Sequence, residues 1–231
     1  TALLGKETHP DCRAAVEDAA RLCADLGHDV VELAPALDVV ALVRTFLVIG
    51  TVDAAGQVRT VMATAGRKVG FDDFEPQTWL LATIGARLRA IDFAEAQEAA
   101  RLVGRSMARF FTDVDLLLTP TMAYPPLRND ELRVTAAQSS MIRVLRSLPI
   151  RAGLDRLLDV LAGTAFEATA NTMLFNMTGQ PAMSMPLYWT PDGLPIGVQF
   201  AGRFGAEATL LRLAAQLEAA RPWFSRRPPL S

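Results

Sequence analysis

The 231-residue sequence predicts an α/β fold in which helices cover a mixed β-sheet core. Three observations support this prediction: an amphipathic helix followed at once by a strand near the N-terminus, a short apolar strand in the middle of the chain, and a strand pair joined by a tight turn near the C-terminus. The composition agrees with a packed core, because 51% of the residues are apolar and 21% are charged. The net charge of -2 gives no reason to expect nucleic acid or an anionic membrane as a partner.

Residues 9–26 form the predicted amphipathic helix. Pro10 suits its first turn, Gly27 ends it, and one face carries an apolar stripe. The stripe consists of Val16, Ala19, Leu22, Cys23 and Leu26. Residues 28–34, HDVVELA, are predicted to be a strand. A helix followed by a strand at this spacing is typical of the second half of a βαβ crossover, so we expect the partner strand to lie before Thr1.

A mostly helical region is predicted in the first half of the chain. Residues 36–67 are expected to be helical with a break at Gly50 or Gly56, and residues 77–111 are expected to form two helices. No apolar run here approaches the roughly 18–20 residues of a membrane span, because Arg, Thr and Gly interrupt the richest stretch, residues 39–52.

Three strands are predicted in the second half. Residues 115–121, DLLLTPT, form a short apolar run that ends at Pro120 and suits a strand buried on both faces. Residues 181–189 and 194–202 are predicted strands on either side of TPDG, whose Pro and Gly occupy the positions that a type I turn prefers. We expect the latter two to form a hairpin beside the first strand in one mixed sheet.

Helices are predicted around these strands, over residues 138–147, 152–175 and about 206–220. In the last helix five residues are expected to point inward: Leu210, Leu211, Leu213, Ala214 and Leu217. No internal repeat and no Gly/Ser linker is present, so residues 1–231 are expected to be a portion of one larger domain.

The two cysteines, Cys12 and Cys23, lie eleven residues apart on the first predicted helix. That spacing separates them by roughly 16 Å along the helix axis, whereas a disulfide requires Cα atoms within about 7 Å. We interpret both as core thiols, which fits a reducing, cytoplasmic setting.

No arrangement typical of a catalytic centre is present. His9 and His28 are the only histidines, and both flank the first helix, where a turn or capping role is expected. No nucleophile elbow, no Cys/His cluster with metal-ligand spacing and no Gly-rich phosphate loop occurs. We therefore expect neither a metal nor a cofactor.

Hydroxyl and amide side chains do gather beside the predicted strand ends. They are Thr119, Thr121, Asn171, Thr172, Asn176, Thr178 and Ser184. Such groups fix ligands in otherwise apolar pockets, but they also satisfy backbone groups where strands end. The residues alone leave both interpretations open and favour the structural one.

Three stretches resemble the amidase signature family. They are DLLLTPTMAYPP at 115–126, FNMTGQPAMSMP at 175–186, and GLPIGVQFAGRFGAEATLLRLAAQLEAARPWF at 193–224. The helix and strand of residues 9–34 resemble the family segment that follows the signature region. The resemblance therefore covers essentially the whole chain, as the C-terminal half of the domain.

The resemblance implies hydrolysis of a carboxamide through a serine acyl-enzyme. The family uses a Ser nucleophile, a second Ser with a cis peptide bond, and a Lys that withdraws the proton through the bridging Ser hydroxyl. The Gly/Ser-rich loop of the family has no counterpart here. Ser139 and Ser140 lack surrounding glycines, and neither Lys6 nor Lys68 stands in a family motif. No catalytic residue is therefore assigned to this chain.

The resemblance also implies residues that line the substrate cleft, from the segments that match 119–124 and 169–178. The candidates are Thr119, Thr121, Thr169, Asn171 and Asn176. For Asn176 the alternative is that its side chain fixes the turn MTGQP that follows it.

The function expected first is an amidase, acting on a linear or cyclic amide, whose catalytic half lies outside this chain. The alternative is a non-catalytic binding or assembly module derived from the same fold. An unrelated α/β domain is the third hypothesis, which a structure without a helix-flanked sheet would favour. The expected partners are a small-molecule amide substrate and either the missing N-terminal half or further copies of the chain, with no nucleic acid and no membrane.

Overall fold

A computed structural model describes residues 7–128, 135, 139–140, 142–143, 158 and 169–228. The chain divides into two compact units. The first comprises Thr1–Val39, Arg101–Leu127 and Phe166–Ser231, and the second comprises Val40–Ala100 and Arg128–Ala165. Each unit is described by itself below.

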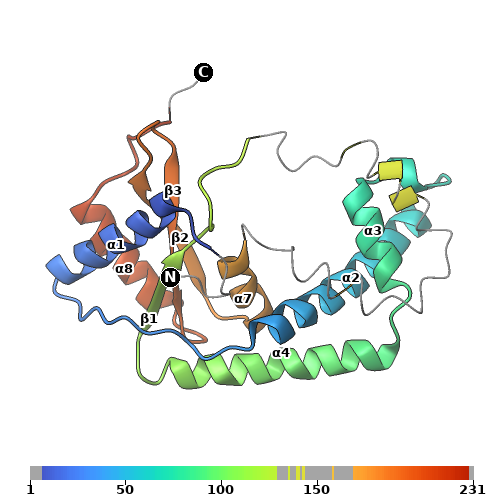
Figure 1. The fold of residues 1–231 in the computed structure, drawn as a ribbon, viewed down its shortest axis with the longest axis horizontal. Coiled ribbons are helices and arrows are strands. Elements are labelled where there is room, and N and C mark those ends of the chain that lie inside the picture. Colours follow the sequence, from blue (N-terminus) through green and yellow to red (C-terminus); the bar gives the residue numbers. More distant parts are fainter. Residues whose placement is uncertain are drawn as a thin grey trace. The chain divides into compact units, whose positions relative to one another are not determined.

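The first unit is built on a three-stranded sheet (Figure 1). Strands β1 (Leu116–Pro120), β2 (Ala182–Trp189) and β3 (Pro195–Gly202) lie in the order β1-β3-β2. This confirms the three predicted strands and the α/β class. Both pairings are antiparallel, so the described part of the sheet does not contain the expected mixture of parallel and antiparallel neighbours.

The predicted hairpin joins β2 to β3 through TPDG. The Gly193 N–H donates to the Thr190 carbonyl at 2.9 Å, which is the bond that closes a β-turn. The Thr190 N–H donates to the Leu194 carbonyl at 2.9 Å, and the Thr190 hydroxyl accepts from the Leu194 N–H at 3.0 Å. Local hydrogen bonds therefore fix the register of this hairpin.

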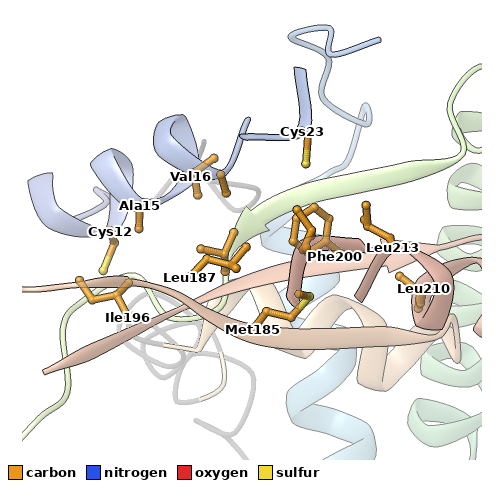
Figure 2. Packing of buried hydrophobic residues seen from close by; sticks show 13 residues of the cluster. Cys12, Ala15, Val16, Cys23, Met185, Leu187, Ile196, Phe200, Leu210 and Leu213 are labelled. Carbon is orange, nitrogen blue, oxygen red and sulfur yellow. The ribbon is translucent and has the colours of Figure 1, made fainter. Parts of the chain in front are cut away.

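Helices α1 (Pro10–Asp25) and α8 (Glu207–Ala220) cover one face of the sheet. The apolar side chains of β2 and β3 that alternate toward this face pack with both helices in one buried cluster. Figure 2 shows Cys12, Ala15 and Val16 of α1 pointing toward Leu187 and Ile196 of the sheet. This cluster is the main apolar core of the first unit.

Helix α8 buries a narrower stripe than expected. Leu210, Leu213 and Leu217 are buried, at 4%, 7% and 0% exposure, but Leu211 is 68% exposed. The prediction of an inward Leu211 was wrong, because it lies about 100° around the helix from Leu210, outside the stripe that repeats every three to four residues.

The expected thiols and caps of α1 are confirmed. Cys12 and Cys23 are both buried and free of disulfides. Burial, with a smaller contribution from the charge of Asp11, raises the pKa of the Cys12 thiol to about 11. His9 caps the helix, since its Nδ1 accepts from the Asp11 N–H at 3.2 Å. Gly27, at φ 89°, ends it in a left-handed conformation that favours glycine.

The segment after α1 is not the predicted strand. Residues 28–34 have no strand assignment, and every one of them is exposed. A β-strand exists only where a neighbouring strand supplies ladder hydrogen bonds, and no described strand pairs with this segment. The apolar, β-branched sequence was a correct sign of strand preference, but preference alone does not make a ladder.

The second unit contains nearly all of α2 (Val39–Thr64), the short 3-10 helix η1 (Phe71–Asp73) and α3 (Pro76–Gly85). Helix α4 (Ala90–Phe110) belongs partly to each unit, and α3 and α4 confirm the two helices expected over 77–111. A smaller core joins α2, η1 and α3 around Trp79, whose ring centroid lies 6.0 Å from that of Phe71 and 5.5 Å from that of Phe74.

Helix α2 runs without the expected break at Gly50 or Gly56. A glycine inside a helix costs only about 1 kcal/mol relative to alanine, which burial of the neighbouring side chains offsets. Glycine is required at position 85, because a Cβ there would lie 1.9 Å from the backbone oxygen of Thr51. The end of α3 therefore packs directly on the backbone of α2.

By length and composition alone, α2 meets the test for a helix that could cross a membrane. The expectation concerned uninterrupted apolar runs, and Arg44, Thr45 and Gly50 do interrupt this one; averaged along its length, α2 is nonetheless apolar enough to meet that test. A core helix of a soluble protein passes the same test, so this finding is weak evidence for a span.

The remaining helical predictions are described only in part. Residues 139–140 and 142–143 are helical, and the rest of 138–147 lies outside the described residues. Of the helix expected over 152–175, Leu158 is helical and buried, and residues 170–175 belong to α7 (Ala170–Thr178), which ends at Gly179 with φ 75°.

Candidate substrate-binding face

A row of polar side chains lies on the sheet face opposite to α1 and α8. Thr119 of β1 pairs with Gln199 of β3, which pairs with Ser184 of β2. Their strand neighbours point to the apolar core, and successive residues of a strand point to opposite faces. Helix α7 lies on this second side of the sheet (Figure 1), so it borders the polar row.

The buried part of this face is a hydrogen-bonded network centred on Gln199. The Gln199 Nε2 donates to the Thr119 hydroxyl at 3.1 Å and to the Asn171 carbonyl at 3.2 Å. The Asn171 Nδ2 donates to the Pro120 carbonyl at 2.8 Å. Gln199, Thr119 and Asn171 are all at most 4% exposed. The network joins the end of β1, the middle of β3 and the first turn of α7, and it satisfies polar groups that would be costly to bury unpaired.

The accessible part of the face is a pair of hydroxyls. The Oγ1 of Thr121 and the Oγ of Ser184 lie 2.6 Å apart, and Ser184 is exposed whereas Thr121 is half-buried. Gly197 of β3 lies beneath them, and the Thr121 N–H donates to its carbonyl at 3.1 Å. A Cβ at Gly197 would lie 2.5 Å from the Ser184 Oγ and 2.9 Å from the Thr121 Oγ1, so the hydroxyl pair requires glycine there.

Thr169 and Asn176 stand at the two ends of α7. Thr169 is the N-cap residue, and its carbonyl accepts from the N–H groups of Thr172 and Met173, both at 3.1 Å. Asn176 is exposed, and no side-chain hydrogen bond is recorded for it among the described residues. The hydroxyl of Thr178, 2.5 Å from the Gln180 Oε1, is the side chain that holds the following turn, so the turn-fixing alternative applies to Thr178 rather than to Asn176.

The structure thus brings three of the five predicted residues together. Thr119, Thr121 and Asn171 meet at the end of β1, whereas Thr169 lies at the start of α7 and Asn176 towards its far end. Sequence reasoning did not single out Gln199 or Gly197. Their signal was present in the second strand of the hairpin, where a polar residue and a glycine alternate with apolar residues.

No catalytic set accompanies this face among the residues that the structure describes. Within the described ranges, no group of three or more His, Cys, Asp or Glu side chains is placed to hold a metal ion. Lys68 is exposed in the second unit, where Ser139 is helical, and Lys6 lies outside the described residues. What the face offers chemically is hydrogen-bond donors and acceptors for a polar ligand, without a nucleophile–base pair.

Comparison with known proteins shows the family to which the chain belongs. The model of the family described as Amidase matches residues 2–211. The chain belongs to the amidase family. It is 32% identical over 223 residues to a 6-aminohexanoate-cyclic-dimer hydrolase of Pseudomonas sp. (strain NK87), and 33% identical over 223 residues to the enzyme of that name from Paenarthrobacter ureafaciens.

The matches cover this chain far better than they cover the relatives. Each of the two similarities covers 96% of this chain and 42% of the relative. A solved structure of a 6-aminohexanoate cyclic dimer hydrolase superposes with a TM-score of 0.79 and 29% identity, and the match covers 98% of this chain and 45% of that one. The chain therefore spans less than half the length of the relatives it matches.

Proposed function

We propose that this chain is the C-terminal portion of a single amidase domain that hydrolyses the C–N bond of a carboxamide. The observation that carries the proposal is the family match over residues 2–211, supported by the 0.79 TM-score against a cyclic-amide hydrolase. The substrate class that we propose is a linear or cyclic amide, and the two relatives named as 6-aminohexanoate-cyclic-dimer hydrolases favour an amide of an ω-amino acid. A cytoplasmic location is part of the proposal, since the two buried, unpaired thiols fit a reducing compartment.

The reaction we propose is acyl transfer to a serine and then to water. The Ser Oγ attacks the amide carbon, its proton passes through the bridging Ser hydroxyl to a neutral Lys, and the amine leaves with a proton. Water then attacks the ester, and the carboxylic acid and the free Ser are released. Backbone N–H groups stabilise the oxyanion in both steps. No stretch of this sequence matches the family loop that carries these groups, so we place them in another portion of the domain.

This chain would contribute to substrate binding. Thr121 is the best placed of the five predicted residues, because its hydroxyl is half-buried and is paired with an exposed partner, Ser184. Thr169 and Asn176 are proposed to line the cleft from α7. Thr119 and Asn171 would support the cleft from its buried side, because their hydrogen bonds hold the end of β1 and the start of α7 together.

The test is hydrolysis measured with two proteins. The isolated 231-residue chain should hydrolyse neither a simple aryl amide nor the cyclic dimer of 6-aminohexanoate above the uncatalysed rate, since loss of a nucleophile and its base costs several powers of ten. The complete natural protein that contains this sequence, with any subunits that co-purify, should hydrolyse at least one of them. Ordinary enzyme rates from the isolated chain would contradict the placement of the catalytic groups.

The alternative function is a non-catalytic binding or assembly module. The observation that favours it is the lack of a nucleophile–base pair among the described residues of the polar face. If the complete natural protein binds an amide, as measured by calorimetry, without hydrolysing it, this alternative replaces the amidase.

A further inference from the structure

Two hydroxyls on the polar face of the sheet have hydrogen-bonding capacity that the described residues do not use. The Thr121 Oγ1 and the Ser184 Oγ lie 2.6 Å apart, and within the described part of the chain no other hydrogen bond is recorded for either hydroxyl. Each hydroxyl has one O–H donor and two acceptor lone pairs. One donor is used between the two oxygens, so the pair still offers one O–H donor, together with lone pairs, to a ligand.

The backbone around the pair holds both oxygens in place. Ser184 belongs to β2, and Thr121 follows β1 directly, with its N–H bonded to the Gly197 carbonyl at 3.1 Å. Gly197 is half-buried, and the two oxygens occupy the space over it that a Cβ would otherwise fill. A ligand therefore does not have to order these groups when it binds, which favours its affinity.

The surroundings of the pair are uncharged. Helix α7, which borders the face, has the sequence ANTMLFNMT without a charged residue. The strand residues that share the face with the pair are not ionisable either, and they are Leu117, Thr119, Ala182, Gly197, Gln199 and Ala201. Removing a charged group from water is costly unless an opposite charge pairs with it. This part of the face therefore suits a neutral ligand that has both a donor and an acceptor.

We propose that the Thr121–Ser184 pair binds the edge of a neutral amide whose N–H and C=O point to the same side. The amide N–H donates to one hydroxyl, that hydroxyl donates to the other, and the second hydroxyl donates to the amide C=O. Hydrogen bonds that follow one another in such a closed ring strengthen each other. The inference rests on the proposed function, because the amide would be the substrate of the same enzyme.

This ring narrows the class of amide. Primary carboxamides have an N–H on the same side as the C=O, and small-ring lactams have the same arrangement because the ring forces their amide bond to be cis. The trans amide of an open chain has its N–H and C=O on opposite sides, so it reaches the pair with one of the two groups only. We therefore assign the pair to the recognition of primary carboxamides and small lactams.

The carboxylic acid that hydrolysis yields fits the pair less well. A carboxylate only accepts hydrogen bonds, whereas the pair has one donor to spare. A second donor would become available only if the bond between Thr121 and Ser184 were broken, and the strand residues and α7 around the pair offer no positive charge. The pair therefore distinguishes an amide from its acid product, which favours release of the product.

Binding of small probes to the complete natural protein that contains this sequence, with any subunits that co-purify, tests the proposal. The probes are hexanamide, caprolactam, N-methylhexanamide and hexanoate, and calorimetric titration gives their Kd values. For a probe that the protein hydrolyses, the KM replaces the Kd. Hexanamide, caprolactam or both should bind at least about tenfold more tightly than N-methylhexanamide and hexanoate, because the latter two leave part of the ring unpaired.

The two amide probes separate the two sources of the same chemistry. Tighter binding of hexanamide alone identifies an open-chain primary amide as the ligand, and tighter binding of caprolactam alone identifies a lactam. Equal affinities for all the probes would overturn the proposal, and so would a lack of binding by both hexanamide and caprolactam.

Substitutions of the hydroxyls show whether they cause the preference. Ser184→Ala and Thr121→Val each remove one hydroxyl, and each should reduce the preference to less than about twofold. The double variant should lose no more than either single variant, because one substitution already opens the ring. Thr121→Ser keeps the hydroxyl and should keep the preference. Ser225→Ala, which removes an exposed hydroxyl elsewhere, is the control and should behave as the unsubstituted protein.

A preference that survives Ser184→Ala would contradict the assignment. This variant decides even if Thr121→Val does not fold, because Ser184 is exposed and its substitution removes no buried group. The outcome is also distinguishable from that of the amidase proposal. A Ser184-dependent preference in a protein that hydrolyses no amide would leave the site standing and refute the function, whereas hydrolysis without such a preference would refute the site alone.

Discussion

Leu217→Ala probes the core that joins α8 to the sheet. Leu217 is 0% exposed and belongs to the cluster that contains Val198 and Phe200 of β3. Replacing a buried leucine by alanine removes its transfer free energy and leaves a cavity, for a combined loss of about 2–5 kcal/mol. Full burial between a helix and a sheet hinders collapse of the cavity, so we expect the upper half of that range. Helix propensity adds little, because Leu and Ala are both good helix formers.

Leu211→Ala is the matched control on the same helix. It deletes the same atoms, but Leu211 is 68% exposed, so its substitution should change the free energy of unfolding by no more than about 0.5 kcal/mol. Urea unfolding followed by circular dichroism on both variants gives the two differences from the shift in midpoint at constant slope. Equal losses for the two variants, or a loss below about 1 kcal/mol for Leu217→Ala, would refute the packing described for α8.

Three further predictions concern glycine contacts and thiol ionisation. Gly85→Ala should destabilise by several kcal/mol or prevent folding, because its Cβ would meet a backbone oxygen of α2 at 1.9 Å. Gly50→Ala, with nothing within 4 Å, should stabilise by up to about 1 kcal/mol in the same urea unfolding experiment. Gly197→Ala should cost about 1–3 kcal/mol and break the hydroxyl pair above it, and a crystal structure with that pair intact would contradict this. Stability should fall as the pH rises from about 9 to about 11, because the unfolded state then loses the Cys12 proton that the folded state, with its pKa raised to about 11, retains. Cys12→Ala should lose less stability over that pH range, and an equal loss would place the effect elsewhere.

Elements with local signals were predictable. The stripe and the end of α1 follow from a helical repeat closed by Gly27, and the β2–β3 hairpin follows from TPDG between two apolar runs. Strand β1 ends at Pro120, as its sequence indicates. In each case the residues that specify the element lie within a few positions of the backbone that they shape, so their effect does not depend on the rest of the fold.

The candidate site was predictable as a set of residues but not as an arrangement. The sequence placed Thr119, Thr121 and Asn171 near strand ends, where a polar side chain is free either to bind a ligand or to satisfy the backbone. Gln199 joins two of these residues across 80 and 28 positions, and such long-range bonds have no local signature. The assignment of Thr119, Thr121, Thr169, Asn171 and Asn176 to substrate binding stays a prediction.

Sequence by itself determined where α1 and α8 begin and end, how the hairpin turns and which thiols are buried, because these depend on periodicity and short-range backbone bonds. Tertiary structure decided which glycines are essential, which leucines of α8 face the core and whether a strand-like segment is a strand. Gly50 and Gly85 are chemically identical, and only the approach of the Thr51 backbone makes one of them irreplaceable. Residues 28–34 prefer the strand conformation, but a ladder needs hydrogen-bond partners from a second strand, and a local sequence cannot supply them.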